Sequence, residues 1–249
     1  LLEQGADIDK AADDGATHLY AASHKGHVEV VRMLLEQGAD IDKARNGGRT
    51  PLFAASGNGH VEVVRMLLDQ GADIDKAMDD GCTILFIASH QGHVEVVRML
   101  IEAGAETDKA VNGGQTPLFI ASQKDHVEVV RLLIEAGAET DKAKNKGETP
   151  LFIASHNSHV EVVRMLLDQG AYIDKATDSG ATPLYIASEK GHVEVVRMLL
   201  AASSLLPHQE VVDINKATDS GETPLFIASV HDHVEVVRML LERGADIDK

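Results

Sequence analysis

The sequence predicts an all-α fold of stacked, antiparallel helix pairs, and three observations support it. Within each unit, apolar residues recur at helical spacing. Thr-Pro pairs and glycines mark the expected helix starts and ends. A fixed repeat length of about 20–50 residues indicates a stacked array and not one closed globule. Nearly the same sequence motif recurs every 33 residues, beginning at Gly15, Gly48, Gly81, Gly114, Gly147 and Gly180, and once more at Gly221.

The 249 residues are therefore interpreted as a single array, because units of this kind pack only on their neighbours and count as one continuous domain. The first five residues copy residues 34–38, so we expect the chain to begin inside a helix and to be cut from a longer array. We expect residues 1–10 to end a preceding repeat. Seven repeats should follow, at 11–43, 44–76, 77–109, 110–142, 143–175, 176–216 and 217–249.

The repeat at 44–76 illustrates how the first helix is encoded. Thr50 carries a side chain that can cap a helix, and Pro51 follows at the first helical position, where a missing N–H has no cost. Residues 52–56 should form a short helix with small residues on one side, which lets a second helix approach closely. Residues 57–59, with two glycines, should end it.

A second helix should follow His60. Val61, Val64, Leu67 and Leu68 form an apolar stripe at helical spacing. A glycine at position 71 supplies a left-handed helix end, and the extended chain then reaches a turn signal at residues 79–81. Neither helix can bury its stripe alone, so copies must stack.

The core must be built mainly from aliphatic residues, because hydrophobic residues make up 44% of the chain while Trp is absent and aromatics are 3%. Seven aromatic residues occupy one repeated position. We interpret them as inter-repeat core, since rings that stack on bases are accompanied by a basic groove. They are Tyr20, Phe53, Phe86, Phe119, Phe152, Tyr185 and Phe226.

The charge balance of 23 basic and 40 acidic residues gives −17 and includes no basic block. Nucleic acid and anionic membranes are therefore poor partners, because both require a Lys/Arg surface. Two interpretations of the acidity stay open: it keeps a long surface soluble, or it attracts a basic partner. No apolar run approaches the ~18 residues of a membrane span. A single cysteine favours a reducing compartment, so we expect an intracellular, cytoplasmic protein.

The repeated words resemble the ankyrin repeat: Gly-x-Thr-Pro-Leu at the start, Gly-His before Val-Glu-Val-Val, then Leu-Leu and Gly-Ala-Asp. The resemblance covers essentially every residue outside one insertion. It implies an ankyrin-repeat solenoid with projecting β-turn or hairpin loops, whose turn tips and first helices face a groove. Members of the family are overwhelmingly protein-binding scaffolds without catalysis. Asp125, Ser158 and Asp232 replace the family's Gly before His, so we expect those turns to differ locally.

Catalysis, a cofactor and a metal site are not expected. The motifs of nucleotide-binding loops, zinc proteases and serine hydrolases do not occur. The repeated histidines, His27 to His233, should lie ~10 Å apart, too far to share one ion. We expect each to form a local hydrogen bond that fixes the turn between its two helices. Asp40-x-Asp42 resembles half of a calcium loop but lacks the Gly and distal Glu.

Positions where the repeats differ are the candidate partner-binding residues, because the scaffold tolerates change there. We expect Met78 and Val111 to be exposed on adjacent tips and to mark a contact patch. The turn-tip residues are Arg45, Asn46, Arg49, Met78, Asp79, Cys82, Val111, Gln115, Lys144, Lys146, Glu148 and Thr177. The residues at first-helix ends are His24, Lys25, Asn58, His90, Gln91, Gln123, Lys124, His156, Asn157, Glu189 and Lys190. Neutral drift at exposed positions is the alternative.

An insertion of eight residues lies near residues 201–210. The second helix of that repeat should extend through residues 201–206 and end at Pro207. Leu205 and Leu206 are either part of a tolerated surface loop or an apolar anchor. Asp213-Ile214-Asn215 resembles the ankyrin segment that an asparaginyl hydroxylase modifies.

The leading hypothesis is a non-catalytic scaffold that binds a protein or peptide along the face of turn tips and first helices. Two alternatives remain: a structural spacer or regulatory segment of a larger repeat protein, and a consensus-like engineered scaffold with no natural ligand. Residues 241–249 lack cap-like polar residues, so we also expect end-to-end self-association through uncapped terminal repeats.

Overall fold

The computed structural model describes residues 7–205 and 211–249. In these residues the regular secondary structure is helical, apart from one antiparallel bridge between Arg45 and Arg49. The chain forms two compact units, residues 1–112 and 113–249.

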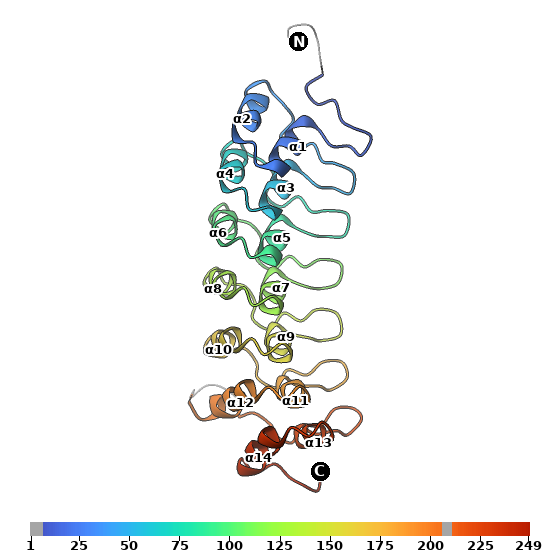
Figure 1. Cartoon of the computed structure of the whole chain (residues 1–249), viewed down its shortest axis with the longest axis vertical. Coiled ribbons are helices and arrows are strands. Elements are labelled where there is room, and N and C mark those ends of the chain that lie inside the picture. Colours follow the sequence, from blue (N-terminus) through green and yellow to red (C-terminus); the bar gives the residue numbers. More distant parts are fainter. Residues whose placement is uncertain (1–6, 206–210) are drawn as a thin grey trace. The chain divides into compact units, whose positions relative to one another are not determined.

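Each repeat contributes one pair of helices, as the all-α prediction requires. Unit 1 contains α1 (His18–Lys25), α2 (Val28–Glu36), α3 (Pro51–Gly57), α4 (Val61–Asp69), α5 (Ile84–Gln91) and α6 (Val94–Glu102). Unit 2 contains α7 (Pro117–Gln123), α8 (Val127–Glu135), α9 (Pro150–His156), α10 (Val160–Asp168), α11 (Pro183–Glu189), α12 (Val193–Leu205), α13 (Pro224–Val230) and α14 (Val234–Glu242). Within each unit, the first helices stack on one another and the second helices form a neighbouring column (Figure 1).

Threonine caps begin the first helices, as predicted. The Thr50 Oγ1 accepts a hydrogen bond of 3.1 Å from the backbone N–H of Phe53, and Pro51 occupies the first turn. Thr17 and Thr83 cap α1 and α5 in the same way although no proline follows them. The cap satisfies one of the N–H groups that a helix start leaves unpaired, so the side-chain oxygen and not the proline is the shared start signal.

The buried stripe of the second helix differs from the predicted one. In α4 the fully buried residues are Val63, Val64 and Leu67, whereas Val61 and Leu68 are half-buried. The reason is that α4 packs against α3 of its own repeat and also against α2 and α6. The equivalent of Val63 in α2 is Val30, which has no earlier helix pair to cover it and is 46% exposed.

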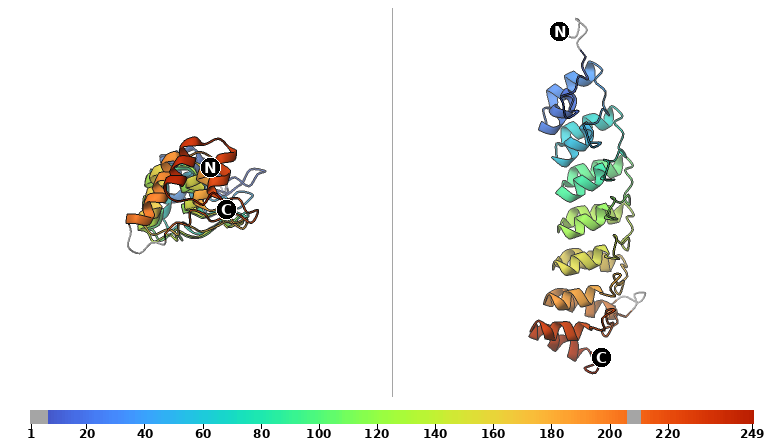
Figure 2. Two further views of the ribbon diagram at one scale, coloured as in Figure 1. Left: turned by 90° about the horizontal axis from the view of Figure 1, so that it is seen from below. Right: turned by 90° about the vertical axis from the view of Figure 1, so that its right-hand side faces the viewer.

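The loops between repeats form projecting β-turns, as predicted, and all turns of a unit lie on one side of its helices (Figure 2). In one turn the N–H of Gly48 donates to the carbonyl of Arg45 at 3.1 Å. Successive turns are also joined by their backbones, since the N–H of Asn46 donates to the carbonyl of Asp14 at 3.1 Å. Backbone bonds constrain the path of the loop and leave the side chains at its tip free to vary.

The histidines join repeats, and the expected bond inside their own interhelix turn is wrong. None of the capping positions from His27 to His159 forms a side-chain cap. Instead, the His60 Nε2 lies 3.0 Å from the carbonyl oxygen of His24 in the preceding repeat. Within their own units His93, His159, His192 and His233 contact a carbonyl at the end of the preceding first helix in the same manner. A nonlocal bond of this kind has no signal in the local sequence.

Carboxylates of the Asp-x-Asp motifs form a second set of hydrogen bonds between repeats. The Asp42 Oδ1 accepts a bond of 3.1 Å from the N–H of Asp73, and the Asp141 Oδ1 accepts one of 2.9 Å from the N–H of Tyr172. Asn215 replaces Asp at this position and its Oδ1 accepts from the N–H of Asp246 at 2.9 Å. These residues therefore have a structural use that their resemblance to a calcium loop did not indicate.

The turns that carry Asp125, Ser158 and Asp232 do not differ locally, contrary to expectation. Their φ angles of 59°, 63° and 58° lie in the left-handed region, beside the 73° of Gly59. The bond that follows is also retained, since the N–H of His159 donates to the carbonyl of Ala154 at 3.0 Å. A side chain in this region is disfavoured by sterics, so the stacking of the repeats holds these residues in place.

The aromatic positions form inter-repeat core, with one exception. Tyr20, Phe53, Phe86, Phe119, Phe152 and Tyr185 are buried. Phe226 is 50% exposed because, among the residues that the structure describes, no helix pair follows α14 to pack on α13.

The insertion lengthens the second helix of its repeat, as predicted: α12 extends over 13 residues to Leu205, against 9 in α10. Leu206 and Pro207 lie outside the described residues, as does the side chain of Leu205.

Three turn-tip residues are less accessible than expected. Cys82 is buried, with 8% of its surface exposed, and Met78 and Val111 are half-buried. Each of these tips follows the preceding turn closely: a methyl group added at Gly48 would lie 3.0 Å from the Met78 Cα. The tip therefore has an inner side that packs and an outer side that is free, a distinction the sequence pattern does not reveal.

Six serines at one position of the first helices bury hydroxyl groups for which the described residues supply no hydrogen-bond partner: Ser23, Ser56, Ser89, Ser122, Ser155 and Ser188. Replacing Ser155 by Ala should raise the free energy of unfolding by about 1 kcal/mol, because burying an unpaired hydroxyl is unfavourable. Urea titration followed by circular dichroism measures this. Ser229→Ala is the matched control, since the exposed Ser229 donates to the carbonyl of Leu225 at 2.8 Å, and we expect no gain. A lower midpoint for Ser155→Ala would contradict the prediction.

Burial raises the pKa of Cys82 to about 12, with the charge of Asp80 adding to the rise and Arg49 opposing it. The reactive thiolate is therefore scarce at pH 8. We expect a thiol reagent such as dithionitrobenzoate to modify the native chain at least ~100-fold more slowly than the urea-unfolded chain, whose thiol has an ordinary pKa near ~8.5. Equal rates in the two states would show that Cys82 is accessible in solution.

Candidate functional site

Each unit has a pocket between its turn tips and its first helices. The unit 1 pocket has a volume of about 380 Å³ and the unit 2 pocket about 450 Å³. The unit 1 pocket is lined by Tyr20, His24, Arg45, Arg49, Phe53, Ala54, Gly57, Asn58, Met78, Asp80, Cys82, Ile87 and Gln91. The unit 2 pocket is lined by Lys146, Glu148, Phe152, Thr177, Asp178, Ser179, Ala181, Tyr185, Ile186 and Glu189.

In the unit 1 pocket, Arg45 extends from a turn tip over the first helix of the preceding repeat. Its guanidinium forms an ion pair with Asp14, with 2.9 Å between Nη2 and Oδ2. The guanidinium carbon lies 5.7 Å from the centre of the Tyr20 ring, within the range of a cation–π contact. Arg49, on the same tip, is exposed, so this rim presents a basic side chain to solvent.

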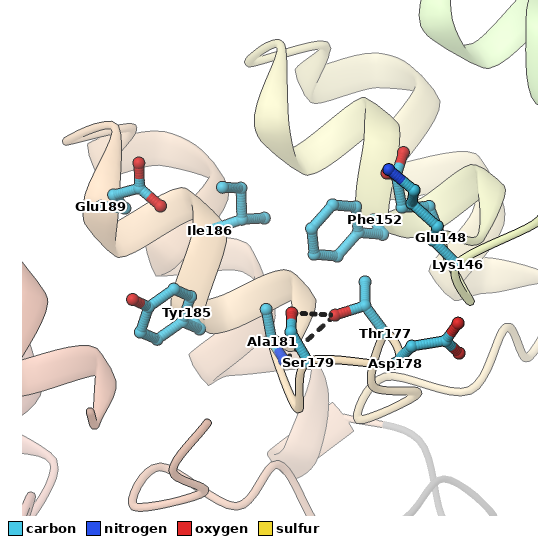
Figure 3. Close-up of a pocket in the computed structure, with 10 residues that line it drawn as sticks. All are labelled: Lys146, Glu148, Phe152, Thr177, Asp178, Ser179, Ala181, Tyr185, Ile186 and Glu189. Atoms are coloured by element: carbon cyan, nitrogen blue, oxygen red, sulfur yellow. Dashed lines mark hydrogen bonds between the residues drawn. The ribbon is translucent and has the colours of Figure 1, made fainter. Parts of the chain in front are cut away.

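The unit 2 pocket has an apolar floor and a charged rim. Phe152 and Ile186, from α9 and α11, belong to one buried cluster and lie next to each other in Figure 3. The rim carries three carboxylates and one ammonium group, from Glu148, Asp178, Glu189 and Lys146. An apolar surface with charges around it favours the side chain of a partner that is itself apolar along its length and charged at its end.

Ion pairs and one phenol bond hold the rim of the unit 2 pocket. Lys144 pairs with Glu148 at 2.7 Å and Lys190 with Glu189 at 2.9 Å. The Tyr185 hydroxyl donates to the Glu222 Oε2 at 3.0 Å. Burial, followed by this bond, raises the pKa of Tyr185 to about 12, so the phenol stays neutral at physiological pH.

No group of three or more His, Cys, Asp or Glu in residues 7–205 and 211–249 could hold a metal ion. Nor does any helix described in the structure have both the length and the apolar character to cross a membrane.

The structure brings together part of the set of candidate residues. Those that line the unit 1 pocket are His24, Arg45, Arg49, Asn58, Met78, Cys82 and Gln91. Those that line the unit 2 pocket are Lys146, Glu148, Thr177 and Glu189. The candidates outside both pockets are Lys25, Asn46, Asp79, His90, Val111, Gln115, Gln123, Lys124, Lys144, His156, Asn157 and Lys190.

Sequence reasoning missed the pocket floors. Phe152, Tyr185 and Ile186, like Tyr20 and Phe53 in unit 1, occupy positions that are nearly constant among the repeats. A search for positions that vary between repeats finds the rim residues. It cannot find the floor, because nearly the same residue types form the floor in every repeat. The aromatic periodicity was the available signal, since a ring in the core can still present one edge to the surface.

The comparisons with known proteins concern the whole chain. A family model described as ankyrin repeats (3 copies) matches residues 1–78, 71–144, 136–204 and 177–249. Among solved structures, the crystal structure of the human ASB11 ankyrin repeat domain is similar, with a TM-score of 0.80 and 25% sequence identity. The match covers 93% of this chain and 99% of that chain. The comparison with curated proteins found no match.

The helix pairs, the turns between them and the family match from residue 1 to residue 249 agree with one another. This chain belongs to the ankyrin repeat family.

Proposed function

We propose that this chain is a non-catalytic scaffold that binds a segment of a partner protein along the face formed by its turn tips and first helices. Ankyrin repeats are generally protein–protein interaction modules. The observation that carries the finer proposal is the placement of the variable residues. Eleven of the candidate residues line the two pockets, seven in unit 1 and four in unit 2, although they come from tips and helix ends far apart in sequence.

The chemistry of the pockets supports binding of side chains from a partner. In each pocket an aromatic floor is combined with charged or polar groups at the rim, and interface anchors are commonly residues that fill such sites. The two rims differ, since unit 1 presents Arg45 and Arg49 and unit 2 presents mainly carboxylates. A segment with an acidic part and a basic part would match both.

The surface as a whole favours a basic partner and disfavours nucleic acid and anionic membranes. The net charge is −17, with −9 in unit 1 (10 basic and 19 acidic residues) and −8 in unit 2 (13 and 21). A charge of one sign accelerates association with partners of the other sign and depends on salt. An intracellular, cytoplasmic location is part of the proposal, since a buried, unpaired cysteine suits a reducing compartment.

Charge reversal on the tips tests this face. The chain, immobilised on beads, should retain partner proteins from a cell extract. Arg49→Glu with Asp178→Lys should lower that retention at least ~10-fold, because the basic rim of the unit 1 pocket and the acidic rim of the unit 2 pocket are both reversed. Quantitative mass spectrometry of the retained proteins is the measurement.

The matched control makes the same two kinds of substitution on second helices. Arg65→Glu with Asp168→Lys alters exposed residues of α4 and α10 that line neither pocket. Retention should stay within ~2-fold of the unchanged chain. Equal loss from the tip pair and the helix pair would reject the tip face as the binding surface.

Self-association is a second candidate, favoured by exposed apolar residues at both ends of the array. The last helix pair exposes Phe226, Val230, Val234 and Leu241, and Ile247 follows it. In the first pair α2 exposes Val30 and Met33. The helices α2 and α14 have the same nine residues, VEVVRMLLE, and inside each unit such helices pack on their neighbours. We propose that the last pair of one copy packs on the first pair of another.

Light scattering after size-exclusion chromatography tests this contact. The apparent mass of the 249-residue chain should rise with concentration, since head-to-tail contacts of this kind do not close. Val234→Glu with Leu241→Glu should restore a constant mass near 26.7 kDa. Tyr172→Glu, at another exposed apolar position, should leave the rise intact. A constant mass for the unchanged chain at every concentration would exclude the contact.

A further inference from the structure

One position of the turn tip lies over the aromatic ring of the preceding repeat. In the second repeat Arg45 occupies this position, and its guanidinium carbon lies 5.7 Å from the centre of the Tyr20 ring. In the fifth repeat Lys144 occupies the same position, and its Nζ lies 5.3 Å from the centre of the Phe119 ring. Both distances lie within the ~6 Å at which a cation is attracted to the face of a ring. Two separate repeats have therefore placed a positive charge at the same structural position.

Each of these cations is also held by a carboxylate. Arg45 pairs with Asp14 at 2.9 Å and Lys144 pairs with Glu148 at 2.7 Å. The arrangement thus combines an aromatic surface for the apolar stem of a long side chain with an anion for its charged end. It is a binding site for a basic side chain that the protein fills with its own residues.

At Phe152 the same position is held by Thr177, which is too short to cover the ring. Its Oγ1 is bound within its own turn, 3.0 Å from the Ser179 Oγ, and accepts a bond of 3.2 Å from the N–H of Ala181. Figure 3 shows Thr177 turned toward Ser179 and Ala181, below Phe152. The unit 2 pocket, of about 450 Å³, is lined by both Phe152 and Thr177.

The charges around this pocket suit a cation. Glu148, Asp178 and Glu189 line it, against Lys146 alone among the basic residues. Lys144 and Lys190 already pair with Glu148 and Glu189. Asp178 is exposed at the rim and forms no ion pair with any residue that the structure describes. Its carboxylate therefore remains available to a basic group from outside.

We propose that the unit 2 pocket binds a lysine or arginine side chain of the partner, in the place that Arg45 and Lys144 fill in other repeats. The proposal rests on the proposed function and names the chemistry of the anchor residue. The stem of the incoming side chain packs against Phe152 and Ile186, and its charged end reaches the carboxylate of Asp178 at the rim (Figure 3). The partner segment is thereby basic where it crosses this pocket.

Short peptides test the site without knowledge of the partner. The probes are N-acetylated, C-amidated Gly-Arg-Gly, Gly-Lys-Gly and Gly-citrulline-Gly, the last a neutral analogue of the arginine peptide. We expect the two basic peptides to shift the methyl NMR signals of Thr177, Ala181 and Ile186 with a Kd on the order of 10 mM, because one desolvated cation–π contact is too weak by itself to reach ~1 mM. The citrulline peptide should bind at least ~10-fold more weakly. Equal shifts from all three peptides would overturn the proposal.

A variant that fills the pocket with one of the protein's own side chains gives a second test. Thr177→Lys should place an ammonium group over Phe152, as Lys144 does over Phe119, and abolish the shifts. Val111→Lys adds the same charge at the equivalent tip position of unit 1 and should leave binding unchanged within ~2-fold. Unaltered circular dichroism establishes that both variants fold. Unchanged binding by Thr177→Lys would overturn the proposal.

The outcome is separable from that of the proposed function. If the basic peptides fail to bind while the tip variants still lose partner proteins, the scaffold function stands and the basic anchor is wrong. If the peptides bind but the tip variants retain every partner, the site exists and the proposed binding face does not serve those partners.

Discussion

No helix pair in this chain can bury its apolar residues by itself, and the rest of the structure follows from that constraint. Val63 is fully buried where neighbouring pairs cover it, whereas its equivalent Val30 is largely exposed in the first pair. Phe152 and Phe226 differ in the same way. Because the core is shared between repeats, each residue of the repeated pattern must satisfy two neighbours at once. The repetition of the buried residues is a physical consequence of that shared core.

Polar bonds between repeats set the distance and register that the apolar core alone would leave loose. Histidine rings reach carbonyls of the preceding first helix, and aspartate carboxylates accept backbone N–H groups of the next repeat. Both kinds of bond use residues that recur in every repeat or nearly so. Backbone hydrogen bonds also join each turn to the next. The fold therefore does not depend on the tip side chains that point away from the neighbouring turns. Variation there is tolerated for that reason.

The pockets form where the constant core residues meet the variable tip residues. Their floors are rings of the shared core, and their shape depends on how far one tip residue extends over the ring below it. Arg45 and Lys144 extend over Tyr20 and Phe119, while Thr177 turns back to its own loop and places no long side chain over Phe152. A change of one tip side chain thus alters what lies over the ring without altering the scaffold. Recognition can therefore evolve at single positions of a constant fold.

The sequence by itself determined the helix pairs, their caps, the turns and the candidate rim, because a 33-residue period, Thr-Pro and Gly are local signals that survive without tertiary information. It did not determine where the histidines bond, that Cys82 is buried, that Val63 and not Val61 faces the core, or that Phe152 and Ile186 form a pocket floor. Those features depend on contacts between residues more than 30 positions apart. Only the tertiary structure decides them, because the face of a residue is fixed by what the neighbouring repeat places against it.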